Sequence, residues 1–594
     1  MDRTQRSHDG IAAPKVPNKE QKAVLNSSAR RVKISARAGT GKTATLLMLA
    51  EELKSSRKSD LERASILYLV YNARASKEAS PRFKGLARVS TIHSFALGSI
   101  PKDGALRKRI REAQEKKERF PDCDASLFVD DFKDLKRGKH KQAALCARFL
   151  AFFLNSTHAT RGDAAEAYGD ASKKFLPEDL CRDFNRHLDK TMAVIERHMR
   201  DWVNGRELCP HDFYLKYSQK NPERWLLASL EQYNTLLVDE GQDLSPVMLD
   251  AVEQFPGRVF VVGDTHQQIY AFRHATDAML HYEADAAFEL PVSFRFGAPV
   301  AQFATIFIRA VKQDSHFLVS GNAKVTSSLQ FYEGNPRPGL LGAAVLARTH
   351  GGLFDAAVTM LDVGAQFVFF GEGTKGFLQR TGDVYSLSCG AHSEIRDPLI
   401  RSFTSLAELD EHAEAVDDRS LAQIVKNVSK YGTRIPSLLA KLNSERKVRA
   451  IEDVPQGSVV LAIVHGVKGL EFPEVWLCED IAWKLHNART EHPEAVNEEA
   501  NITYVALTRA QYRLYLPLSL KVELSPGHRQ AEPQLRAESR RPPKPILPKG
   551  QRVYTMAYGH GTVLDSSTDG LKRLVQFDAH RAQLWMHVGL LRQL

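Results

Sequence analysis

Ile34-Ser-Ala-Arg-Ala-Gly-Thr-Gly-Lys-Thr43 decides the fold of this chain. A β-branched run precedes it and an apolar helical pattern follows, so the segment joins a strand to a helix. Gly39 and Gly41 let the backbone turn its N–H groups toward phosphate oxygens, Lys42 can reach the β- and γ-phosphates, and the Thr43 hydroxyl can bind Mg²⁺. The stretch therefore predicts a nucleotide-binding α/β domain.

An acidic partner for this loop follows at the end of a second predicted strand. Leu236-Leu-Val-Asp-Glu240 places Asp239 where a carboxylate can bind Mg²⁺ and Glu240 where a carboxylate can activate water. Acidic pairs at strand ends also occur on protein surfaces, and glycine turns occur by chance. The two motifs together favour a site that binds and hydrolyses a nucleoside triphosphate.

The composition is that of a globular protein with several domains. The chain has 594 residues, 43% of them hydrophobic and 26% charged, and its net charge of +11 suits a polyanionic partner. We find no signal sequence or apolar run of bilayer length, so we expect a cytoplasmic protein that contacts no membrane.

The cysteines form no CxxC pair, which predicts neither a disulfide framework nor a zinc site. They are Cys123, Cys146, Cys181, Cys209, Cys389 and Cys478.

Short apolar runs alternate with amphipathic stretches along most of the chain. Continuous apolar strands joined by helices indicate parallel sheets buried on both faces, and the strands suffice for two sheets divided near Leu290. The stretch from about Ile100 to Trp225 is helix-patterned and basic, with Phe149 to Leu154 as its apolar core. Ser405 to Arg449 is also helical. The predicted strands are Val32 to Ser35, Ser65 to Val70, Thr235 to Val238, Val259 to Val262, Ala343 to Ala347, Gln366 to Phe370, Ser458 to Val464, Glu474 to Cys478 and Tyr512 to Leu516.

The last seventy or so residues have a different pattern. Lys521 to Lys549 is polar and punctuated by prolines, which predicts a linker. Gly550 to Leu594 has short strand patterns with turn signals at Tyr558-Gly-His-Gly561 and Thr568-Asp-Gly570. This pattern predicts a small β-barrel.

The acidic motif, taken with the phosphate-binding loop, resembles a known family. Asp239-Glu-Gly-Gln-Asp243 is similar to the DExQD box of the UvrD/Rep-like helicases of superfamily 1. The rest of that family's motif set follows in order between about residues 15 and 520, which makes the resemblance very specific. The matching segments are Pro17-Asn-Lys-Glu-Gln21, Ser90-Thr-Ile-His-Ser-Phe95, Gly263-Asp-Thr-His-Gln-Gln-Ile-Tyr-Ala-Phe-Arg273, Ser293-Phe-Arg295, Ala347-Arg-Thr349, His465-Gly-Val-Lys-Gly-Leu-Glu-Phe472 and Tyr504-Val-Ala-Leu-Thr-Arg-Ala510.

Within that family the amino-acid sequences of several segments look closest to the F-box DNA helicase branch. They are the Gly263 to Arg273 motif, Ser293-Phe-Arg-Phe-Gly297, His211-Asp-Phe-Tyr-Leu-Lys216 and Tyr431-Gly-Thr-Arg-Ile-Pro436. Only about thirty residues precede the phosphate-binding loop, so we expect no F-box ahead of it. The departures from the family pattern remove no charged catalytic group. They are Ala36 for the first glycine of the loop, Gly241 for alanine, His274 for glycine and Ser293 for asparagine.

The resemblance implies an α/β fold class with two RecA-like P-loop motor domains, helical insertions and a small C-terminal β-barrel. The implied first RecA-like ATPase domain (1–99 and 226–290) is interrupted by a helical insertion (100–225). The second RecA-like domain (291–404 and 450–520) is interrupted by a reduced helical insertion (405–449). A linker (521–549) and a Tudor-like β-barrel (550–594) complete the implied chain.

The resemblance also implies roles for individual residues. The catalytic set is Lys42, Asp239, Glu240, Gln267, Arg295 and Arg509, with Thr43 and Asp239 on Mg²⁺. The ATP-binding set is Ala36, Arg37, Ala38, Gly39, Thr40, Gly41, Lys42 and Thr43, with Gln21 and Phe294 on adenine and Glu471 on ribose. The DNA-binding set is Thr91, His93, Tyr270, Phe272, Arg348 and His465. For His93, a buried hydrogen-bonded histidine is the alternative.

The activity implied is that of an ATP-dependent 3′–5′ DNA helicase or single-strand translocase in DNA repair or recombination, with ATP and Mg²⁺ as cofactors. Its implied partners are single-stranded and tailed duplex DNA, which would place it at the nucleoid in a bacterial cell. Arg552 to Val563, followed by Leu574-Val-Gln-Phe577, is similar to the Tudor-like tail of bacterial UvrD-type helicases. That tail docks on RNA polymerase in some relatives, so RNA polymerase or another protein is an implied partner.

Two other classes of protein compete with the helicase hypothesis. One is an ATP-regulated scaffold, bound to nucleic acid or RNA polymerase, that separates no strands; a scaffold need not keep all six catalytic residues, which argues against it. The other is a helicase–nuclease. Gly550 to Leu594 has no carboxylate cluster with a lysine and the chain has no cysteine set for an iron–sulfur cluster, so a nuclease is disfavoured.

Overall fold

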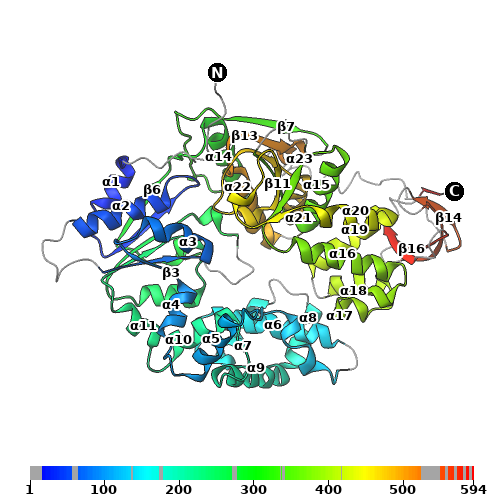
Figure 1. Ribbon diagram of the computed structural model, residues 1–594, viewed down its shortest axis with the longest axis horizontal. Coiled ribbons are helices and arrows are strands. Elements are labelled where there is room, and N and C mark those ends of the chain that lie inside the picture. Colours follow the sequence, from blue (N-terminus) through cyan, green and yellow to red (C-terminus); the bar gives the residue numbers. More distant parts are fainter. Residues whose placement is uncertain are drawn as a thin grey trace. The chain divides into compact units, whose positions relative to one another are not determined.

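The computed structural model describes residues 16–55, 65–135, 138–172, 178–269, 277–334, 336, 342–415, 418–491, 493–522, 549–555, 559–566, 572–578, 583–587 and 592–593. The chain divides into two compact units (Figure 1). Unit 1 is formed by residues 1–327 and 492–508, and unit 2 by residues 328–491 and 509–594. Most of the predicted linker (523–548) lies outside the described residues.

Unit 1 is built on a six-stranded parallel sheet with the order β3-β2-β4-β5-β1-β6. Its strands are β1 (Arg31–Ala36), β2 (Ile66–Val70), β3 (Arg88–Thr91), β4 (Thr235–Val238), β5 (Arg258–Gly263) and β6 (Ala286–Leu290). The inner strand β4 is buried along its whole length, because apolar side chains cover both faces of the sheet. Leu236 and Val238 enter one apolar cluster and Leu237 the other, as the two-residue period of a strand requires.

Helices cover this sheet on both faces. α1 and α2 contribute Val24, Leu46 and Leu49 to one apolar cluster, and α11 and α12 contribute Leu226 and Val247 to the other. The helices are α1 (Lys19–Leu25), α2 (Lys42–Ser55), α3 (Ala73–Arg82), α4 (Ile92–Ser99), α11 (Trp225–Leu230), α12 (Pro246–Glu253) and α13 (Ala278–His281).

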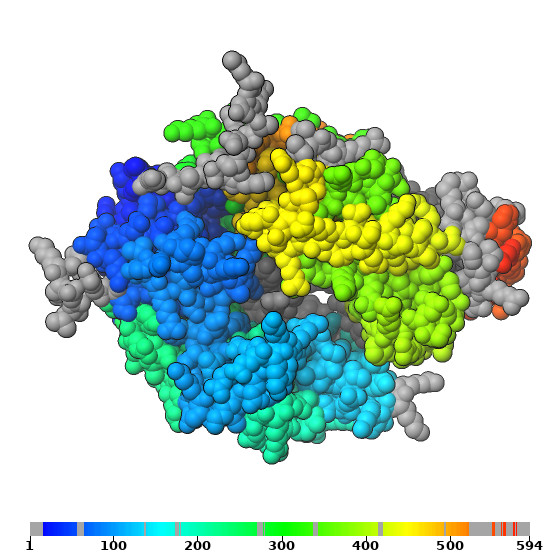
Figure 2. Space-filling view, in the orientation of Figure 1, coloured from blue at the N-terminus to red at the C-terminus, as the bar shows by residue number. Residues whose placement is uncertain are grey.

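The predicted helical insertion is confirmed as helical, and it forms a continuous surface, light blue to teal, in Figure 2. Its helices are α5 (Ala105–Glu115), α6 (Lys139–Asn155), α7 (Arg161–Ser172), α8 (Glu178–Arg186), α9 (Leu188–Val203) and α10 (His211–Lys220). Phe149, Leu150, Phe153 and Leu154 of α6 are buried in its core beside Trp202, so the predicted apolar segment is confirmed.

Unit 1 does not end with its sheet. Helix α14 (Ala298–Lys312) packs against α22 (Val496–Leu507), which the chain reaches only after passing through unit 2. The predicted division near Leu290 therefore marks the end of the first sheet, whereas the compact unit continues to Ser327.

Unit 2 is built on a seven-stranded parallel sheet with the order β10-β9-β11-β8-β12-β13-β7. Its strands are β7 (Ser328–Tyr332), β8 (Ala343–Ala347), β9 (Phe367–Phe370), β10 (Lys447–Val448), β11 (Val459–Ile463), β12 (Phe472–Leu477) and β13 (Ala510–Pro517). Its helices are α15 (His350–Asp362), α16 (Thr374–Ser388), α17 (Pro398–Arg401), α18 (Leu406–Ala415), α19 (Arg419–Tyr431), α20 (Ile435–Ser444), α21 (Glu479–Thr490) and α23 (Leu518–Val522).

The C-terminal segment forms a five-stranded antiparallel sheet with the order β17-β16-β15-β14-β18. Its strands are β14 (Arg552–Thr555), β15 (Gly559–Ser566), β16 (Lys572–Phe577), β17 (Gln583–His587) and β18 (Arg592–Gln593). Among the described residues no pairing joins β17 to β18, so the sheet is shown but its closure into a barrel is not. Val563 and Val575 are buried in the large apolar cluster of unit 2.

The two parallel sheets confirm the predicted α/β class, and each of the nine predicted strands corresponds to a strand of the structure. The parallel strands that were not predicted, β3, β6, β7 and β10, all lie at sheet edges. An edge strand has one free side, so it carries fewer of the continuous apolar residues by which inner strands are recognised. No helix in the described part of the chain is both long and apolar enough to cross a membrane.

A buried lysine closes the end of helix α6. Lys216 of α10 is 3% exposed, and its ammonium group donates to the carbonyl oxygens of Ser156 (2.6 Å) and His158 (2.7 Å) just beyond that helix. Its Nζ lies 4.9 Å from the centroid of the Phe153 ring. Burial, reinforced by the charge of Lys220, lowers the pKa of Lys216 to about 7.

This lysine predicts a pH dependence of stability. Between the folded pKa of about 7 and the ordinary value of 10.5, the unfolded chain binds more protons at this position than the folded chain does. Stability from this group therefore rises with pH across that window. We expect the melting temperature of the wild type minus that of Lys216→Met to increase from pH 7 to pH 10 and to stay constant below pH 7. A decrease of this signed difference as the pH rises would contradict the assignment.

Candidate functional site

The phosphate-binding loop runs from β1 to α2 and depends on two glycines. Gly39 and Gly41 have φ of +72° and +80°, in the left-handed region that glycine tolerates. A Cβ at Gly39 would lie 2.6 Å from Ser293 Oγ and 2.7 Å from Arg295 Cβ. The Phe294 N–H also donates to the Gly39 carbonyl (2.7 Å). The segment that begins at Ser293 is thus packed directly on the loop.

The charged centre of the site joins the loop to the end of β4. Lys42 Nζ lies 2.8 Å from Glu240 Oε2, and the Thr43 hydroxyl donates to Asp239 Oδ2 (3.0 Å). Tyr68 donates a second hydrogen bond to the same Asp239 oxygen (2.7 Å). The structure therefore brings the predicted lysine, threonine and both carboxylates together.

Burial and charge act against each other at this centre. Burial lowers the pKa of Lys42, but the carboxylates of Glu240, Asp239 and Asp264 outweigh it, so the pKa lies above its ordinary value. Burial and the neighbouring Glu240 raise the pKa of Asp239, while Lys42 opposes them. One cation thus balances a crowded set of acidic groups, which is the arrangement expected where a further cation is to bind.

Glu240 occupies a backbone conformation that few side chains adopt. Its φ is +54°, and its N–H donates to Asp239 Oδ1 (2.9 Å). Gln242 fixes the side chain, because its Nε2 donates to Glu240 Oε2 (2.5 Å). A strained backbone that is held by its surroundings is typical of functional sites.

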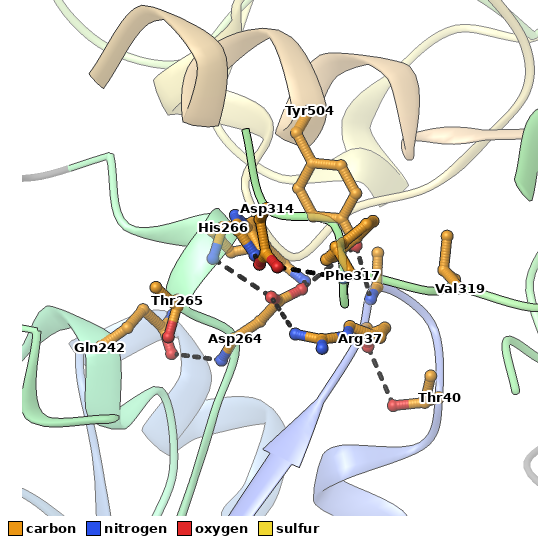
Figure 3. Close-up of polar contacts among 12 residues, drawn as sticks. Arg37, Thr40, Gln242, Asp264, Thr265, His266, Asp314, Phe317, Val319 and Tyr504 are labelled. Carbon is orange, nitrogen blue, oxygen red and sulfur yellow. Dashed lines mark hydrogen bonds and ion pairs between the residues drawn. The ribbon is translucent and has the colours of Figure 1, made fainter. Parts of the chain in front are cut away.

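The carboxylate of Asp264, at the end of β5, connects the site to two other segments (Figure 3). It is 1% exposed and accepts from Gln267 Nε2 (2.7 Å) and from the Tyr504 hydroxyl (3.3 Å). The Tyr504 hydroxyl also accepts from the N–H of Ala38 in the phosphate-binding loop (3.3 Å). One tyrosine of α22 therefore contacts both the loop and the residue that positions Gln267.

A second set of contacts surrounds His266 (Figure 3). Its ring lies 3.3 Å from Asp314 and edge-on to Phe317 at 4.5 Å between centroids. Burial, with the charges of Lys312 and Arg37, lowers the pKa of His266 to about 3, so the imidazole is neutral at pH 7. The contact with Asp314 therefore joins a neutral ring to a carboxylate.

The arginine of the loop completes this set. The guanidinium of Arg37 stacks on Phe317 at 4.6 Å, lies 3.9 Å from Asp264 and donates to the Leu318 carbonyl (3.3 Å). Phe317 therefore contacts the ring of His266 and also packs under Arg37. These contacts hold the chain beyond α14 against the phosphate-binding loop.

Several of these residues have no role predicted from the sequence. Gln242, Asp264, His266 and Tyr504 stand inside the quoted motifs, so their position was available as a signal. Asp314 and Phe317 lie in an irregular segment after α14 and belong to no motif, and only the folded chain places them here.

The residues predicted for adenine gather around Gly41. Gln21 is fully buried, donates to Thr45 Oγ1 (2.9 Å) and closes a capping box with Asn18. A Cβ at Gly41 would lie 3.4 Å from the Phe294 ring and 3.5 Å from Gln21 Nε2. Both side chains are thus beside the loop, and their roles stay predictions.

The two predicted arginine fingers belong to different units. Arg295 is in unit 1, where its guanidinium donates to the Thr508 carbonyl (2.8 Å). Arg509 is in unit 2, is 1% exposed and donates to the Leu470 carbonyl (3.1 Å). Glu471, also in unit 2, accepts from Gln511 Nε2 (3.0 Å).

The predicted strand contacts are also divided between the units. In unit 1, Thr91 caps helix α4, and His93 is half-buried with its Nε2 2.9 Å from Asp212 Oδ1. In unit 2, Arg348 precedes α15 and His465 lies in the short helix η10 (Val464–Val467). Tyr270, Phe272 and the departure at His274 lie outside the described residues.

Comparisons with known proteins identify the family. Residues 17–286 match the UvrD/REP helicase N-terminal domain, and residues 392–521 match the UvrD-like helicase C-terminal domain. F-box DNA helicase 1 of Gallus gallus is 27% identical over 541 residues, which cover 84% of this chain and 49% of that protein. F-box DNA helicase protein 1 of Schizosaccharomyces pombe is 28% identical over 516 residues, which cover 82% and 55%.

A more distant relative is ATP-dependent DNA helicase UvrD2 of Mycobacterium tuberculosis, 26% identical over 355 residues that cover 51% of this chain and 49% of that protein. The chain spans about half the length of the curated relatives it matches. The N- and C-terminal helicase domains follow each other as the ordered motifs predict. The first match contains the phosphate-binding loop and the Asp239 and Gly263 motifs, and the second contains the His465 and Tyr504 motifs. The chain therefore belongs to the UvrD/Rep helicase family.

Proposed function

We propose that this chain hydrolyses ATP to move along single-stranded DNA and to separate the strands of a DNA duplex. The observation that carries the proposal is the pairing of Lys42 with Glu240 and of Thr43 with Asp239 around a glycine loop. That arrangement offers a cation for phosphate oxygens, oxygen ligands for Mg²⁺ and a carboxylate for water.

In this proposal the site promotes cleavage of the γ-phosphate mainly by positioning the phosphates and the attacking water. Lys42 leaves Glu240 to meet the β- and γ-phosphates, and the freed Glu240 carboxylate orients the attacking water and takes its proton. Mg²⁺, held by Thr43 and Asp239, would neutralise charge on the phosphates. Arg295 and Arg509 stabilise the charge that develops on the transferred group, a contribution of about 10³ to 10⁵ in rate where such arginines are well characterised.

The Asp264 carboxylate is proposed to report the state of the nucleotide to the rest of the motor. It holds Gln267, the proposed γ-phosphate sensor, and it is held in turn by Tyr504 of α22. A change at Gln267 therefore acts on the helix that leads directly to Arg509 in unit 2. Such a link can convert nucleotide binding and hydrolysis into movement of the lobes.

Several finer features belong to the same proposal. We infer 3′–5′ polarity, a role in DNA repair or recombination, strand contacts through the predicted DNA-binding residues, and docking of a protein such as RNA polymerase on a C-terminal barrel. They are supported by the resemblance of the ordered motifs and of the C-terminal segment to UvrD-type helicases. The competing function is an ATP-regulated scaffold, which the complete set of catalytic side chains disfavours.

The first test removes the cation of the loop. Lys42→Ala should lower DNA-stimulated phosphate release by roughly 100-fold or more, the scale seen when a preorganised charge is removed from an active site. Binding of single-stranded DNA should persist, because the proposed strand contacts lie elsewhere. Lys54→Ala, in the last turn of the same helix, is the matched control. Unchanged turnover in Lys42→Ala would refute the site, and a wild type without DNA stimulation would favour the scaffold.

The second test removes one hydroxyl from the Asp264 network. Tyr504→Phe should lower kcat about 10-fold and leave KM for ATP nearly unchanged, because Gln267 loses orientation but no direct phosphate contact is removed. Tyr282→Phe is the control, since Tyr282 is equally buried in unit 1 and its hydroxyl has no hydrogen-bond partner among the described atoms. Equal kcat in wild type and Tyr504→Phe would show that the network is only structural.

The third test addresses polarity and substrate. Strand displacement should be faster on a 3′-tailed DNA duplex than on a 5′-tailed or blunt one, and slower when the tail is RNA. A preference for the 5′ tail would overturn the proposed direction while leaving the ATPase proposal intact.

A further inference from the structure

Helix α21 of unit 2 exposes a tryptophan that none of the proposed steps uses. Trp483 is 47% exposed, whereas Trp202 and Trp476 are buried in apolar clusters. A single exposed aromatic residue is common on protein surfaces. Trp483 differs from such a residue because two lysine side chains lie close to its ring.

Two ammonium groups from different helices approach the Trp483 ring. Lys484 Nζ lies 5.1 Å from the ring centroid, and Lys426 Nζ, from α19, lies 5.7 Å from it. The side chain of Lys426 is exposed, so both its charge and the indole are open to an incoming ligand. A ring flanked by cations offers a stacking face together with partners for phosphate.

Side chains of α19 and α21 both pack closely on a pair of glycines at the start of α15. A Cβ at Gly351 would lie 2.1 Å from Gln423 Cγ of α19, and a Cβ at Gly352 would lie 2.0 Å from Asp480 Oδ2 of α21. Only glycine admits such close approach. Gln423 lies one helical turn before Lys426, so the contact places that lysine on the face that α19 turns toward Trp483.

The same contact ties the tryptophan to a predicted DNA-binding loop. Asp480, one turn before Trp483 on α21, accepts from the N–H of Arg348 (3.0 Å) and from the N–H and hydroxyl of Thr349 (2.9 and 3.1 Å). The backbone that carries Arg348 is thus hydrogen-bonded to the helix that carries Trp483. Arg348 and Trp483 are therefore carried by two segments that Asp480 joins.

We propose that Trp483, with Lys426 and Lys484, is a stacking platform for one unpaired base of single-stranded DNA. A base displaces an ammonium group from the indole face, and the two lysines move to the adjoining phosphates. The inference rests on the proposed function and adds a strand contact outside the ordered motifs. Single-stranded DNA is favoured over duplex because only an unpaired strand offers a free base face, and over an acidic peptide because a peptide need not stack on the ring.

The test uses the full-length chain without nucleotide and a labelled oligo-dT. Trp483→Ala should bind the oligonucleotide about 5- to 150-fold more weakly, which corresponds to the loss of one stacked base. Trp483→Phe should fall between Ala and wild type, because a smaller ring still stacks. Tyr512→Ala is the control, since Tyr512 is 44% exposed in the same unit.

Two further measurements separate stacking from charge and from misfolding. Lys426→Ala should reduce the slope of log K against log salt by about 0.7, the value for one phosphate contact on a single strand. Oligo-dT should quench the tryptophan fluorescence of the wild type more than that of Trp483→Phe. Equal binding and equal quenching in wild type and Trp483 variants would overturn the platform.

The remaining outcomes are equally decisive. If polyglutamate of matched charge quenches Trp483 as strongly as oligo-dT, the surface binds an acidic polypeptide and the proposal is wrong. If the wild type binds no oligonucleotide at all, the proposed motor function fails as well. Binding by the wild type with none lost in Trp483→Ala removes only the platform.

Discussion

The buried carboxylate of Asp264 is the interaction on which the site depends. A charge this deep is tolerated only when polar groups surround it, and here they come from three parts of the chain. Gln267, three residues later, and the Tyr504 hydroxyl of α22 donate to the carboxylate, and the Arg37 guanidinium of the phosphate-binding loop lies 3.9 Å from it. Gln242 accepts the backbone N–H of Asp264 (2.9 Å). If Arg37 or Tyr504 were misplaced, the carboxylate would lose one of these partners.

This constraint explains why unit 1 is not continuous in sequence. The tyrosine that completes the network lies after the whole sheet of unit 2, so the chain must return to unit 1 before it finishes that sheet with β13. This second segment of unit 1 ends at Thr508. Thr508 accepts from Arg295 within unit 1, while the next residue, Arg509, pairs through its backbone with Phe472 of unit 2 (2.9 Å). Consecutive residues therefore belong to different units.

In unit 2 an acidic side chain also holds a loop by hydrogen bonds, at the start of α15. Asp480 is half-buried, and its carboxylate accepts backbone N–H groups from Arg348 and Thr349 at the start of α15. Burial raises the pKa of Asp480 to about 6, and the hydrogen bonds from Arg348 and Thr349 oppose that rise.

The sequence by itself determined the local parts: the glycine loop, the acidic strand end, the inner strands of both sheets and the order of the motifs. These depend on contacts between near neighbours and on apolar runs that are buried on both faces, and both leave patterns that can be read without coordinates. The edge strands were not predicted because only some of their side chains are buried, so they lack a continuous apolar run.

Only the tertiary structure decided which distant residues meet. No spacing rule places Asp314 and Phe317 against His266, joins α22 to the phosphate-binding loop, or sets Trp483 between lysines of two helices. Those contacts depend on how helices pack across a sheet and on where the chain re-enters a unit. Packing of that kind follows from the shapes of whole surfaces, which no short stretch of sequence encodes.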